Sequence, residues 1–303
     1  KPARERSKDI WKINLNYENT SPEKKYDMEP VTVFKKHYRV EIRDVDFTKK
    51  LRLSALFNYI QETASRHVEN LGTGVETIEK QCQAAWIFMR ARVEIERYPL
   101  WNEDITIETW QQTPKKFEFE RDFLVRDATG CVIIRMASIW IIVDIKTRAL
   151  KNTDAIAVAY PPVFKERALN ARPEKIKPFP NKKVSYKKKI CYSDTDINGH
   201  INNAKYIDLA TDCFPVEQHR RYFIKSMQIN YVREALPGDS IIVYTDISEL
   251  NSNIVYIGGE KEYDGGAIFN AVVEIMPAKT GPERLQKESP ALKPTRQQAR
   301  KTV

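Results

Sequence analysis

The chain has 303 residues and a mass of 35.3 kDa, a length that suggests about two domains. Its composition, 42% hydrophobic and 30% charged, is typical of a globular protein and unlike that of a disordered or collagen-like chain. The densest apolar run, residues 131–145, is interrupted by Arg135, Ser138 and Asp144, which excludes a membrane-spanning helix there.

The net charge of +9 is concentrated in two segments. Residues 163–189 hold ten basic and two acidic side chains, and residues 278–303 hold seven basic and two acidic ones. Such segments suit an anionic partner such as nucleic acid, a membrane surface or an acidic protein. Because no nucleic-acid-reading motif accompanies them, we expect neither nucleic acid nor membrane as the partner.

In chain order, residues 1–35 form a polar, proline-containing N-terminal extension. Residues 37–42 alternate like a strand, and the apolar residues between Leu53 and Leu71 recur at helical spacing, with Gly72 at the expected end. Strand patterns follow at residues 84–95, 104–111, 117–126 and 131–145.

Residues 151–183 contain five prolines and are predicted to form a linker. The strand and helix patterns then return: a strand at 184–192, a helix around 206–213, and strands at 224–232, 240–247, 253–259 and 267–276. The basic tail, residues 278–303, has three prolines and few apolar residues and is predicted to be disordered.

This order of elements indicates an internal repeat, and the segment from Arg97 to Ile105 aligns in letters with the segment from Arg233 to Ile241. The repeat is domain-sized, so we expect one copy in residues 36–150 and a second in residues 184–277. Each copy would be α+β, with one long helix wrapped by a curved antiparallel sheet. This is the hotdog arrangement, and the sequence predicts a tandem, or double, hotdog.

The second copy carries a polar segment just before its helix. Asp196, Asn198 and His200 are two residues apart, and Asn202 and Asn203 follow where a helix N-cap is expected. A carboxylate and an imidazole can orient and deprotonate a water, and an Asn amide can hold a water or a developing oxyanion. Unpaired N–H groups at the helix start can polarise a carbonyl oxygen.

The first copy lacks this set, since residues 46–50 read Asp-Phe-Thr-Lys-Lys at the equivalent place. We therefore expect chemistry in the second copy alone. The sequence shows no serine nucleophile elbow, phosphate-binding loop or His-rich metal spacing. Hydrolysis at an acyl carbonyl by activated water is the natural inference, with no cofactor and no metal.

These segments resemble the acyl-acyl-carrier-protein thioesterases. The resemblance rests on Asp196-x-Asn198-x-His200-Ile-Asn202-Asn203-x-Lys205-Tyr206 and Asn230-Tyr-Val-Arg-Glu234, with Arg97-Tyr-Pro-x-Trp101, Thr109-Trp110, Arg121-Asp-x-x-Val-Arg126-Asp and Ser138-x-Trp140 in the first copy. It extends over residues 36–277. It implies a double hotdog that acts in fatty acid biosynthesis and lipid metabolism. The implied reaction is hydrolysis of the thioester that joins a fatty acyl chain to the phosphopantetheine arm of acyl carrier protein.

The resemblance also implies a catalytic network of Asp196, Asn198, His200 and Glu234. Asp196 would orient His200 and stabilise its charge, and Asn198 would position substrate or water. His200 and Glu234 would share the activation of water, and spacing leaves open which of them takes the proton. Many plant members have a Cys after the equivalent Glu, whereas this chain has Ala235, which favours a water route over a thiol route.

The cysteines, Cys82, Cys131, Cys191 and Cys213, form no C-x-x-C pair and are interpreted as small core residues in a reduced compartment. We expect a cytoplasmic protein, or one of the plastid stroma if its origin is a plant or alga. The double hotdog would satisfy hotdog pairing within one chain or form a homodimer.

Several alternatives stay open. The first copy would line an acyl tunnel with Leu56, Ile60, Ala64 and residues 84–89, or these residues are plain core. The basic residues 175–189 would steer the acidic carrier protein, or they are a solvated charge run. The rival functions are an acyl-CoA thioesterase of the hydroxybenzoyl-CoA class, usually one hotdog per chain, and a non-catalytic acyl-thioester-binding hotdog protein.

Overall fold

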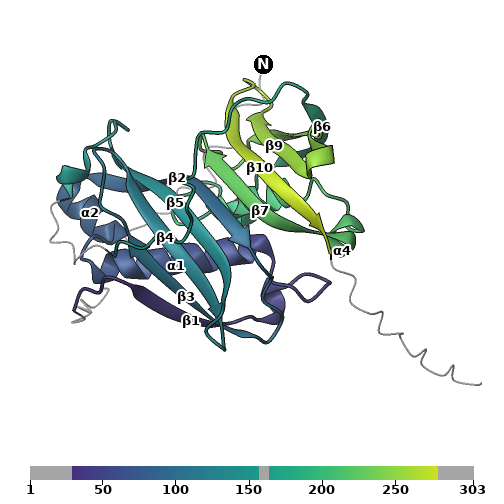
Figure 1. Ribbon diagram of the computed structural model, residues 1–303. Coiled ribbons are helices and arrows are strands. Elements are labelled where there is room, and N and C mark those ends of the chain that lie inside the picture. Colours follow the sequence, from purple (N-terminus) through teal and green to yellow (C-terminus); the bar gives the residue numbers. More distant parts are fainter. Residues whose placement is uncertain (1–28, 157–163, 279–303) are drawn as a thin grey trace, which may run out of the picture.

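The computed structural model describes residues 29–156 and 164–278, and within them ten strands form one antiparallel sheet (Figure 1). The strand order across the sheet is β1-β3-β4-β5-β2-β7-β10-β9-β8-β6. The strands are β1 (Phe34–Arg39), β2 (Ala84–Ile95), β3 (Asp104–Gln111), β4 (Phe119–Asp127), β5 (Val132–Asp144), β6 (Lys183–Lys189), β7 (Tyr222–Tyr231), β8 (Ser240–Asp246), β9 (Ile254–Lys261) and β10 (Ala267–Pro277).

The sheet consists of two halves with the same internal order. In each half the first strand is at the outer edge and the second is at the centre of the whole sheet. The halves join where β2 pairs with β7, from Arg90 opposite Asn230 to Glu94 opposite Ser226. The predicted duplication of a curved antiparallel sheet is confirmed.

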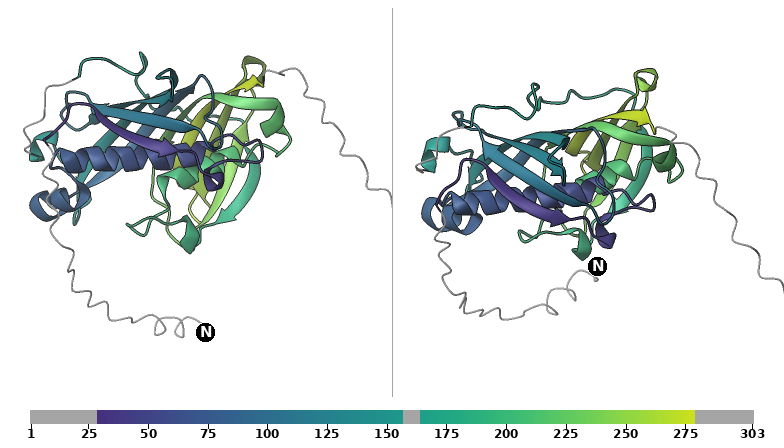
Figure 2. Two further views of the ribbon diagram at one scale, coloured as in Figure 1. Left: turned by 90° about the horizontal axis from the view of Figure 1, so that it is seen from below. Right: turned by 60° about the horizontal axis from the view of Figure 1, so that its bottom comes forward.

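Two helices fill the halves. α1 (Leu53–Asn70) lies along one face of strands β1 to β5, and α3 (Asn203–Thr211) occupies the equivalent place in the second half (Figure 2). Leu56 and Ile60 on α1 are almost fully buried, which confirms the helical periodicity. The helix ends before Gly72, whose φ of +72° is a left-handed conformation that glycine adopts without steric cost.

The structure differs from the predicted elements in several places. Two helices escaped the sequence analysis, α2 (Val75–Cys82) and α4 (Gln218–Arg221), because both are short and polar. The predicted strands 37–42 and 184–192 end earlier, where the chain turns into the 3₁₀ helices η1 (Ile42–Asp44) and η3 (Tyr192–Asp194). Two further 3₁₀ helices are η2 (Thr153–Ala155) and η4 (Leu250–Ser252).

The interpretation of the cysteines as core residues is wrong for Cys131 and Cys191, which are exposed. Cys82 and Cys213 are half-buried and pack against the hydrophobic core. Cys131 belongs to the turn between β4 and β5, and Cys191 begins η3, so both lie at ends of elements rather than inside them. Burial raises the pKa of the Cys213 thiol to about 11, which makes it a poor nucleophile near neutral pH.

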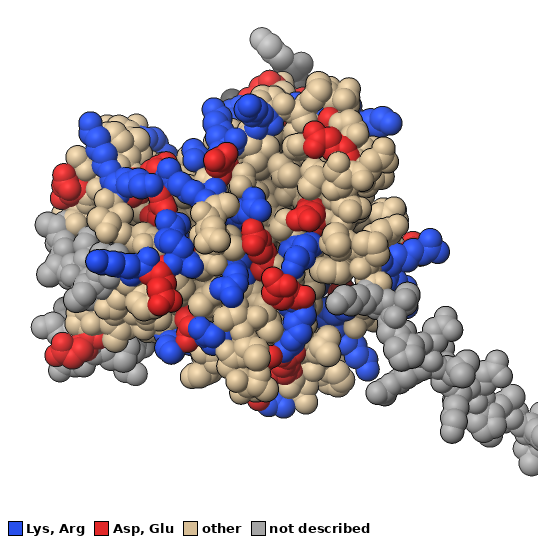
Figure 3. All heavy atoms as spheres, in the orientation of Figure 1, with Lys and Arg blue, Asp and Glu red and all other residues tan. Residues whose placement is uncertain are grey.

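The described part of the basic linker packs on the sheet face opposite α1 (Figure 2). Arg167 forms ion pairs with Glu120 and Asp122 of β4 at 2.9 Å, and both carboxylates are buried. Arg172 pairs with Glu120 as well, at 2.9 Å. These arginines therefore neutralise buried acids of the sheet, and Figure 3 shows Lys and Arg interleaved with Asp and Glu over this face.

Two sequence predictions lie outside the described residues: the polar extension up to residue 28 and the disordered tail from residue 279. None of the helices within residues 29–156 and 164–278 is long and apolar enough to cross a membrane.

Candidate active site

Asp196, Asn198 and His200 lie on one tight turn between η3 and α3. The Asp196 N–H donates to the His200 carbonyl at 2.9 Å, and the Gly199 N–H donates to the Asp196 carbonyl at 3.0 Å. Gly199 has a φ of +73°, which explains glycine at this position. The Asp196 carboxylate also accepts the Asn198 N–H at 2.8 Å. The backbone thus fixes the turn and holds the side chains of Asn198 and His200 at its surface.

The fold brings His200 and Glu234 together, as the resemblance implied. His200 Nε2 lies 3.5 Å from Glu234 Oε2, and the two side chains are 30% and 40% exposed. Glu234 follows β7, and the Ile201 N–H donates to the Ala235 carbonyl at 3.0 Å, which ties this segment to the turn. A single water molecule can hydrogen-bond to both His200 Nε2 and Glu234 Oε2. Base-assisted attack of water on a carbonyl carbon requires such an arrangement.

The other oxygen of Glu234 forms an ion pair with Arg148, a residue that the sequence analysis did not identify. Arg148 belongs to the turn after β5 in the first half and has a φ of +60°. The Asp144 carboxylate accepts the N–H groups of Thr147 and Lys146 in this turn, at 2.9 and 3.0 Å. The hydrogen bonds from Thr147 are the main cause that lowers the Asp144 pKa to about 2. The first copy therefore supplies a rigidly held cation to the site.

Asp196 is placed differently from its expected role. Its carboxylate accepts a hydrogen bond from its own turn, and no hydrogen bond joins it to the His200 ring among the described residues. Its backbone, however, holds the His200 carbonyl. In this structure Asp196 therefore positions His200 through the shape of the turn.

Some of the polar groups at the start of α3 already have hydrogen-bond partners within the protein. Asn202 is the N-cap, and its side-chain oxygen accepts the Ala204 N–H at 2.8 Å, so this N–H is not available to polarise a substrate carbonyl. The Tyr231 hydroxyl donates to the Asn203 carbonyl at 3.3 Å, and the Tyr206 hydroxyl donates to the Arg233 carbonyl at 3.4 Å. Burial, with Glu234 and Asp196 nearby, raises the pKa of the Tyr206 phenol, which keeps it a neutral donor.

A pocket of about 410 Å³ adjoins the turn and extends between the second copy and the first. Asp196, Asn198, Asn202 and Asn203 line it from the second copy, and the first-copy lining comes from α1, α2 and strands β2 to β5. The Asn203 amide donates to Gln61 of α1 at 3.2 Å, which joins the two walls. Its volume lies in the range typical of small-molecule pockets.

Residues of α1 and of 84–89 were expected either to line an acyl tunnel or to be plain core, and the pocket shows that some of them line it and others do not. Ala64, Trp86 and Phe88 line the pocket, whereas Leu56 and Ile60 do not and are fully packed core. The three residues of α1 are four positions apart and share one helix face, so the pocket reaches this face only from Ala64 onwards, towards the end of the helix.

Arg121 also lines the pocket and is buried. Its guanidinium donates to Nδ1 of His67 at 2.7 Å, while Nε2 of His67 lies 2.9 Å from the Val31 carbonyl. Burial and the nearby Arg121 lower the His67 pKa to about 3, so the imidazole is neutral and can accept from Arg121. Within residues 29–156 and 164–278, no group of three His, Cys, Asp or Glu side chains is arranged to hold a metal ion.

A duplicated hotdog with a His–Glu pair beside an apolar pocket has the features of the hotdog thioesterases. The chain belongs to the acyl-ACP thioesterase family. Residues 31–158 match the acyl-ACP thioesterase N-terminal domain, and residues 180–271 match the acyl-ACP thioesterase C-terminal domain.

Curated relatives come from plants. The chain is 28% identical over 214 residues to a chloroplastic palmitoyl-acyl carrier protein thioesterase of Arabidopsis thaliana, which covers 67% of this chain and 52% of the relative. It is 29% identical over 251 residues to the chloroplastic oleoyl-acyl carrier protein thioesterase 2 of the same plant, covering 75% and 66%. The chain thus spans between about half and two thirds of the length of these relatives.

Solved structures share the fold. An acyl-ACP thioesterase from Bacteroides thetaiotaomicron superposes with a TM-score of 0.73 at 24% identity, covering 81% of this chain and 98% of that one. The 12:0-ACP thioesterase from Umbellularia californica gives 0.71 at 22% identity, covering 82% and 98%. These likenesses establish the double hotdog.

Proposed function

We propose that this chain is a thioester hydrolase that releases free fatty acid from fatty acyl-acyl carrier protein. The observation that carries the proposal is the His200–Glu234 pair, in which Glu234 is also bound by Arg148. His200 and Glu234 do not themselves line the interdomain pocket, but Asp196 and Asn198 of the same turn do. The chain's membership of the family supports the same reading. The names of the curated relatives specify acyl carrier protein thioesters, which supports the carrier protein as partner.

In the proposed reaction, a water held by Glu234 Oε2 and His200 Nε2 attacks the thioester carbonyl carbon. One proton of the water passes to His200, because the Glu234 carboxylate is already engaged in the ion pair with Arg148. Glu234 stabilises the imidazolium that forms. When the C–S bond breaks, His200 returns the proton to the leaving thiolate, which yields the fatty acid and the carrier thiol.

The two remaining residues of the proposed network, Asp196 and Asn198, position the other groups. Asp196 fixes the turn that carries His200, and Asn198, on the pocket wall, positions the substrate or the water. The Asn198 side-chain amide would be the donor to the carbonyl oxygen, because the N–H groups of Asn198, Gly199 and Ala204 are already hydrogen-bonded within the protein. A thiol nucleophile after Glu234 is absent because residue 235 is a buried alanine.

The two copies of the fold have different proposed roles. We propose that residues 36–150 hold the acyl chain, that residues 184–277 supply the catalytic groups, and that residues 151–183 connect them. The pocket supports this division, because its aromatic side chains, Trp86, Phe88, Phe119 and Trp140, all come from the first-copy strands, while residues 196–203 contribute mainly polar side chains and α1 contributes both kinds. The acyl chain would pass Ala64 and Phe88 on its way into the first copy.

Partners and location follow from the same proposal. The carrier protein is acidic and would approach near the lysines of β6, although Lys187 and Lys188 already pair with Glu262 and Asp194. Because β2 and β7 join the halves within one chain, a homodimer would use another surface, such as the edge strand β1 or β6. We propose the cytoplasm as the location, or the plastid stroma for a plant or algal chain, as the chloroplastic relatives suggest.

The test is release of free fatty acid from a panel of acyl-carrier-protein thioesters of different lengths, with acyl-CoAs of the same lengths alongside. Preference for the carrier protein supports the proposal. Preference for coenzyme A moves the function to the acyl-CoA thioesterase alternative with the same site. Binding without release from either substrate, by a folded protein, supports the non-catalytic alternative.

A further inference from the structure

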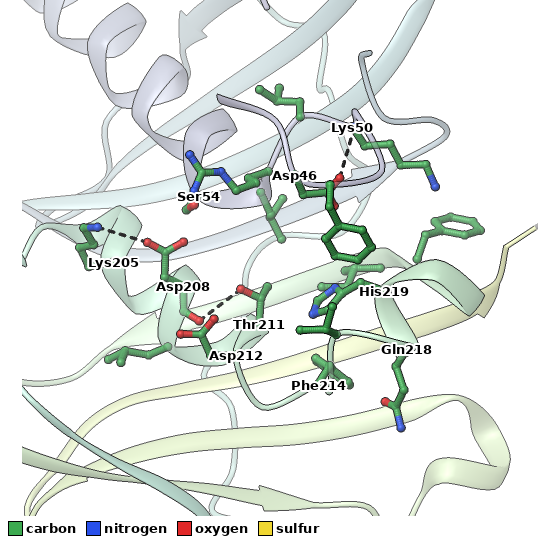
Figure 4. A pocket seen from close by; sticks show the side chains of 18 of the residues that line it. Asp46, Lys50, Ser54, Lys205, Asp208, Thr211, Asp212, Phe214, Gln218 and His219 are labelled. Carbon is green, nitrogen blue, oxygen red and sulfur yellow. Dashed lines mark hydrogen bonds and ion pairs between the residues drawn. The ribbon is translucent and has the colours of Figure 1, made fainter. Parts of the chain in front are cut away.

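The first-copy turn and α3 enclose a second pocket of about 460 Å³ (Figure 4). It is the counterpart of the pocket at the candidate active site under the internal repeat. There, the second-copy turn faces α1; here, the turn at Asp46 faces α3. The equivalence extends to single positions, since Gln61 of α1 lines one pocket and Thr211, at the matching place on α3, lines the other.

The two turns have the same backbone. The Asp46 N–H donates to the Lys50 carbonyl at 2.9 Å, as Asp196 does to His200. The Asp46 carboxylate accepts the Thr48 N–H at 2.7 Å, and Lys49 has a φ of +63° at the position of Gly199. The architecture of the site is therefore preserved in the first copy.

The catalytic groups are not preserved. Lys50 stands in place of His200, and Tyr98 stands in place of Glu234. The Tyr98 hydroxyl donates to the Ile224 carbonyl at 3.2 Å, and burial, together with Asp46, raises the pKa of this phenol. Lys50 and Tyr98 do not form an imidazole–carboxylate pair of the kind that His200 and Glu234 form, which the proposed activation of water requires. A ligand in this pocket would therefore be bound but not hydrolysed.

Part of the pocket lining is suited to an apolar chain, whereas charged side chains, among them Lys50, Asp208 and Asp212, line the rest of it. Its floor contains buried aliphatic side chains, among them Leu51 and Leu209. Phe47, Val216 and Tyr222 line the pocket and are 47%, 59% and 40% exposed. Large apolar side chains that stay exposed around a cavity mark a binding site more often than a plain surface.

The polar end of the pocket offers hydrogen-bond donors. α1 begins here with Arg52 at the N-cap, and this residue makes no side-chain cap, in contrast to Asn202 on α3. Ser54, in the first turn, is only 7% exposed and lines the pocket, and its hydroxyl has no hydrogen-bond partner among the described residues. Figure 4 shows Ser54 at the start of the helix, on the side of Asp208. The hydroxyl and the first-turn N–H groups suit a carbonyl or carboxylate oxygen.

We propose that this second pocket binds a fatty acyl chain without hydrolysing it, with the carbonyl end at Ser54 and the chain among the apolar side chains. The choice of an acyl ligand rests on the proposed function, because the pocket is the repeat-related copy of the proposed substrate site. The ligand is either the free fatty acid product or a second acyl-pantetheine group, which share a carbonyl and a chain.

The test is the binding stoichiometry of the whole chain, measured by isothermal titration calorimetry. One series of titrations uses saturated fatty acids of increasing length, and the other uses the corresponding acyl-pantetheine amides, which cannot be hydrolysed. Two sites per chain are expected for at least one of these ligands, and the series in which the second site appears identifies its source. A single site per chain in every titration would overturn the proposal.

Two matched substitutions assign the sites. Thr211→Trp fills the second pocket and should leave one site and normal hydrolysis, whereas Gln61→Trp fills the other pocket and should leave one site with hydrolysis lost. If Thr211→Trp does not fold, Ser54→Ala replaces it and should weaken the second site about fivefold, as loss of one hydrogen bond predicts. A second site that neither Thr211→Trp nor Ser54→Ala affects would refute its assignment to this pocket. Two sites without any fatty acid release would refute the proposed function and leave this inference standing.

Discussion

Glu234 is shared between the two copies of the fold: one carboxylate oxygen faces His200 of its own copy and the other pairs with Arg148 of the first copy. The ion pair joins residues 86 positions apart in the sequence. The first copy thus contributes directly to the position of a proposed catalytic group.

We expect Arg148→Ala to lower kcat about tenfold with little change in KM, because the Glu234 carboxylate loses its fixed orientation but the acyl pocket is untouched. Arg148→Lys should restore part of the rate, since it keeps the charge. Steady-state kinetics on an acyl-carrier-protein thioester would measure the effect. Arg39→Ala, which breaks the exposed Arg39–Asp104 pair, serves as the control. A rise in KM alone would indicate that Arg148 contacts the substrate instead.

His200→Ala should fold normally and lose between about 100-fold and 10,000-fold of the hydrolysis rate, because the proposed general base is removed. The turn should persist, since its hydrogen bonds come from the backbone and from Asp196. His37→Ala, at an exposed histidine of the first copy, is the matched control. Near-normal hydrolysis by a His200→Ala protein would remove His200 from the mechanism.

Ala235→Cys should not raise activity. The residue is fully buried, so a thiol there is shielded from solvent and must be accommodated by packing. Rates before and after treatment with a thiol-alkylating reagent would measure any thiol contribution. A large gain that alkylation abolishes would reopen the thiol route.

Ala64→Phe should shift the preference towards shorter acyl chains, because Ala64 lines the proposed acyl pocket and a phenyl ring would shorten it. The same measurement on Ala55→Phe, at a buried position of α1 that does not line that pocket, separates pocket filling from general overpacking. Product profiles from a mixed acyl-carrier-protein pool provide the readout. An unchanged profile in a folded Ala64→Phe protein would place the acyl chain elsewhere.

The folded state should lose stability as the pH falls, because of His67. The pKa of its imidazole is about 3 in the folded protein, whereas 6.5 is the ordinary value, which we take for the unfolded chain. Between these two pH values the unfolded chain binds a proton that the folded protein does not, so lowering the pH favours unfolding. The expected loss from pH 6.5 to pH 5 is about 2 kcal/mol. Urea unfolding at both pH values would measure it, and His67→Gln should remove that part of the difference.

The sequence was sufficient for the repeated elements and for the turn. The apolar periodicity of α1 and the alternation of Ala84–Ile95 and Asp104–Gln111 report burial directly, so their bounds agree closely with the structure. The family motif also joined His200 to Glu234, which spacing by itself did not bring together.

Other features depend on tertiary contacts and were therefore hidden. Arg148 is a basic residue in a turn, and nothing in its neighbourhood in the sequence points to Glu234. The first turn of α3 is polar, so the apolar periodicity indicated the helix only from Tyr206, although the polar segment had already indicated an N-cap at Asn202 or Asn203, where the structure has it. Arg167 lies in the basic segment that was predicted to be a linker, and nothing in the sequence indicated that it neutralises buried carboxylates on β4.

The preserved backbone of the two turns has an evolutionary consequence. Asp46 and Asp196 each close their own turn through a carboxylate–N–H bond, so neither turn depends on its His or Lys for stability. Selection can then exchange reactive side chains at position 50 or position 200 without risking the fold. A duplicated chain built in this way is free to retain one site for turnover while the other drifts towards a different task.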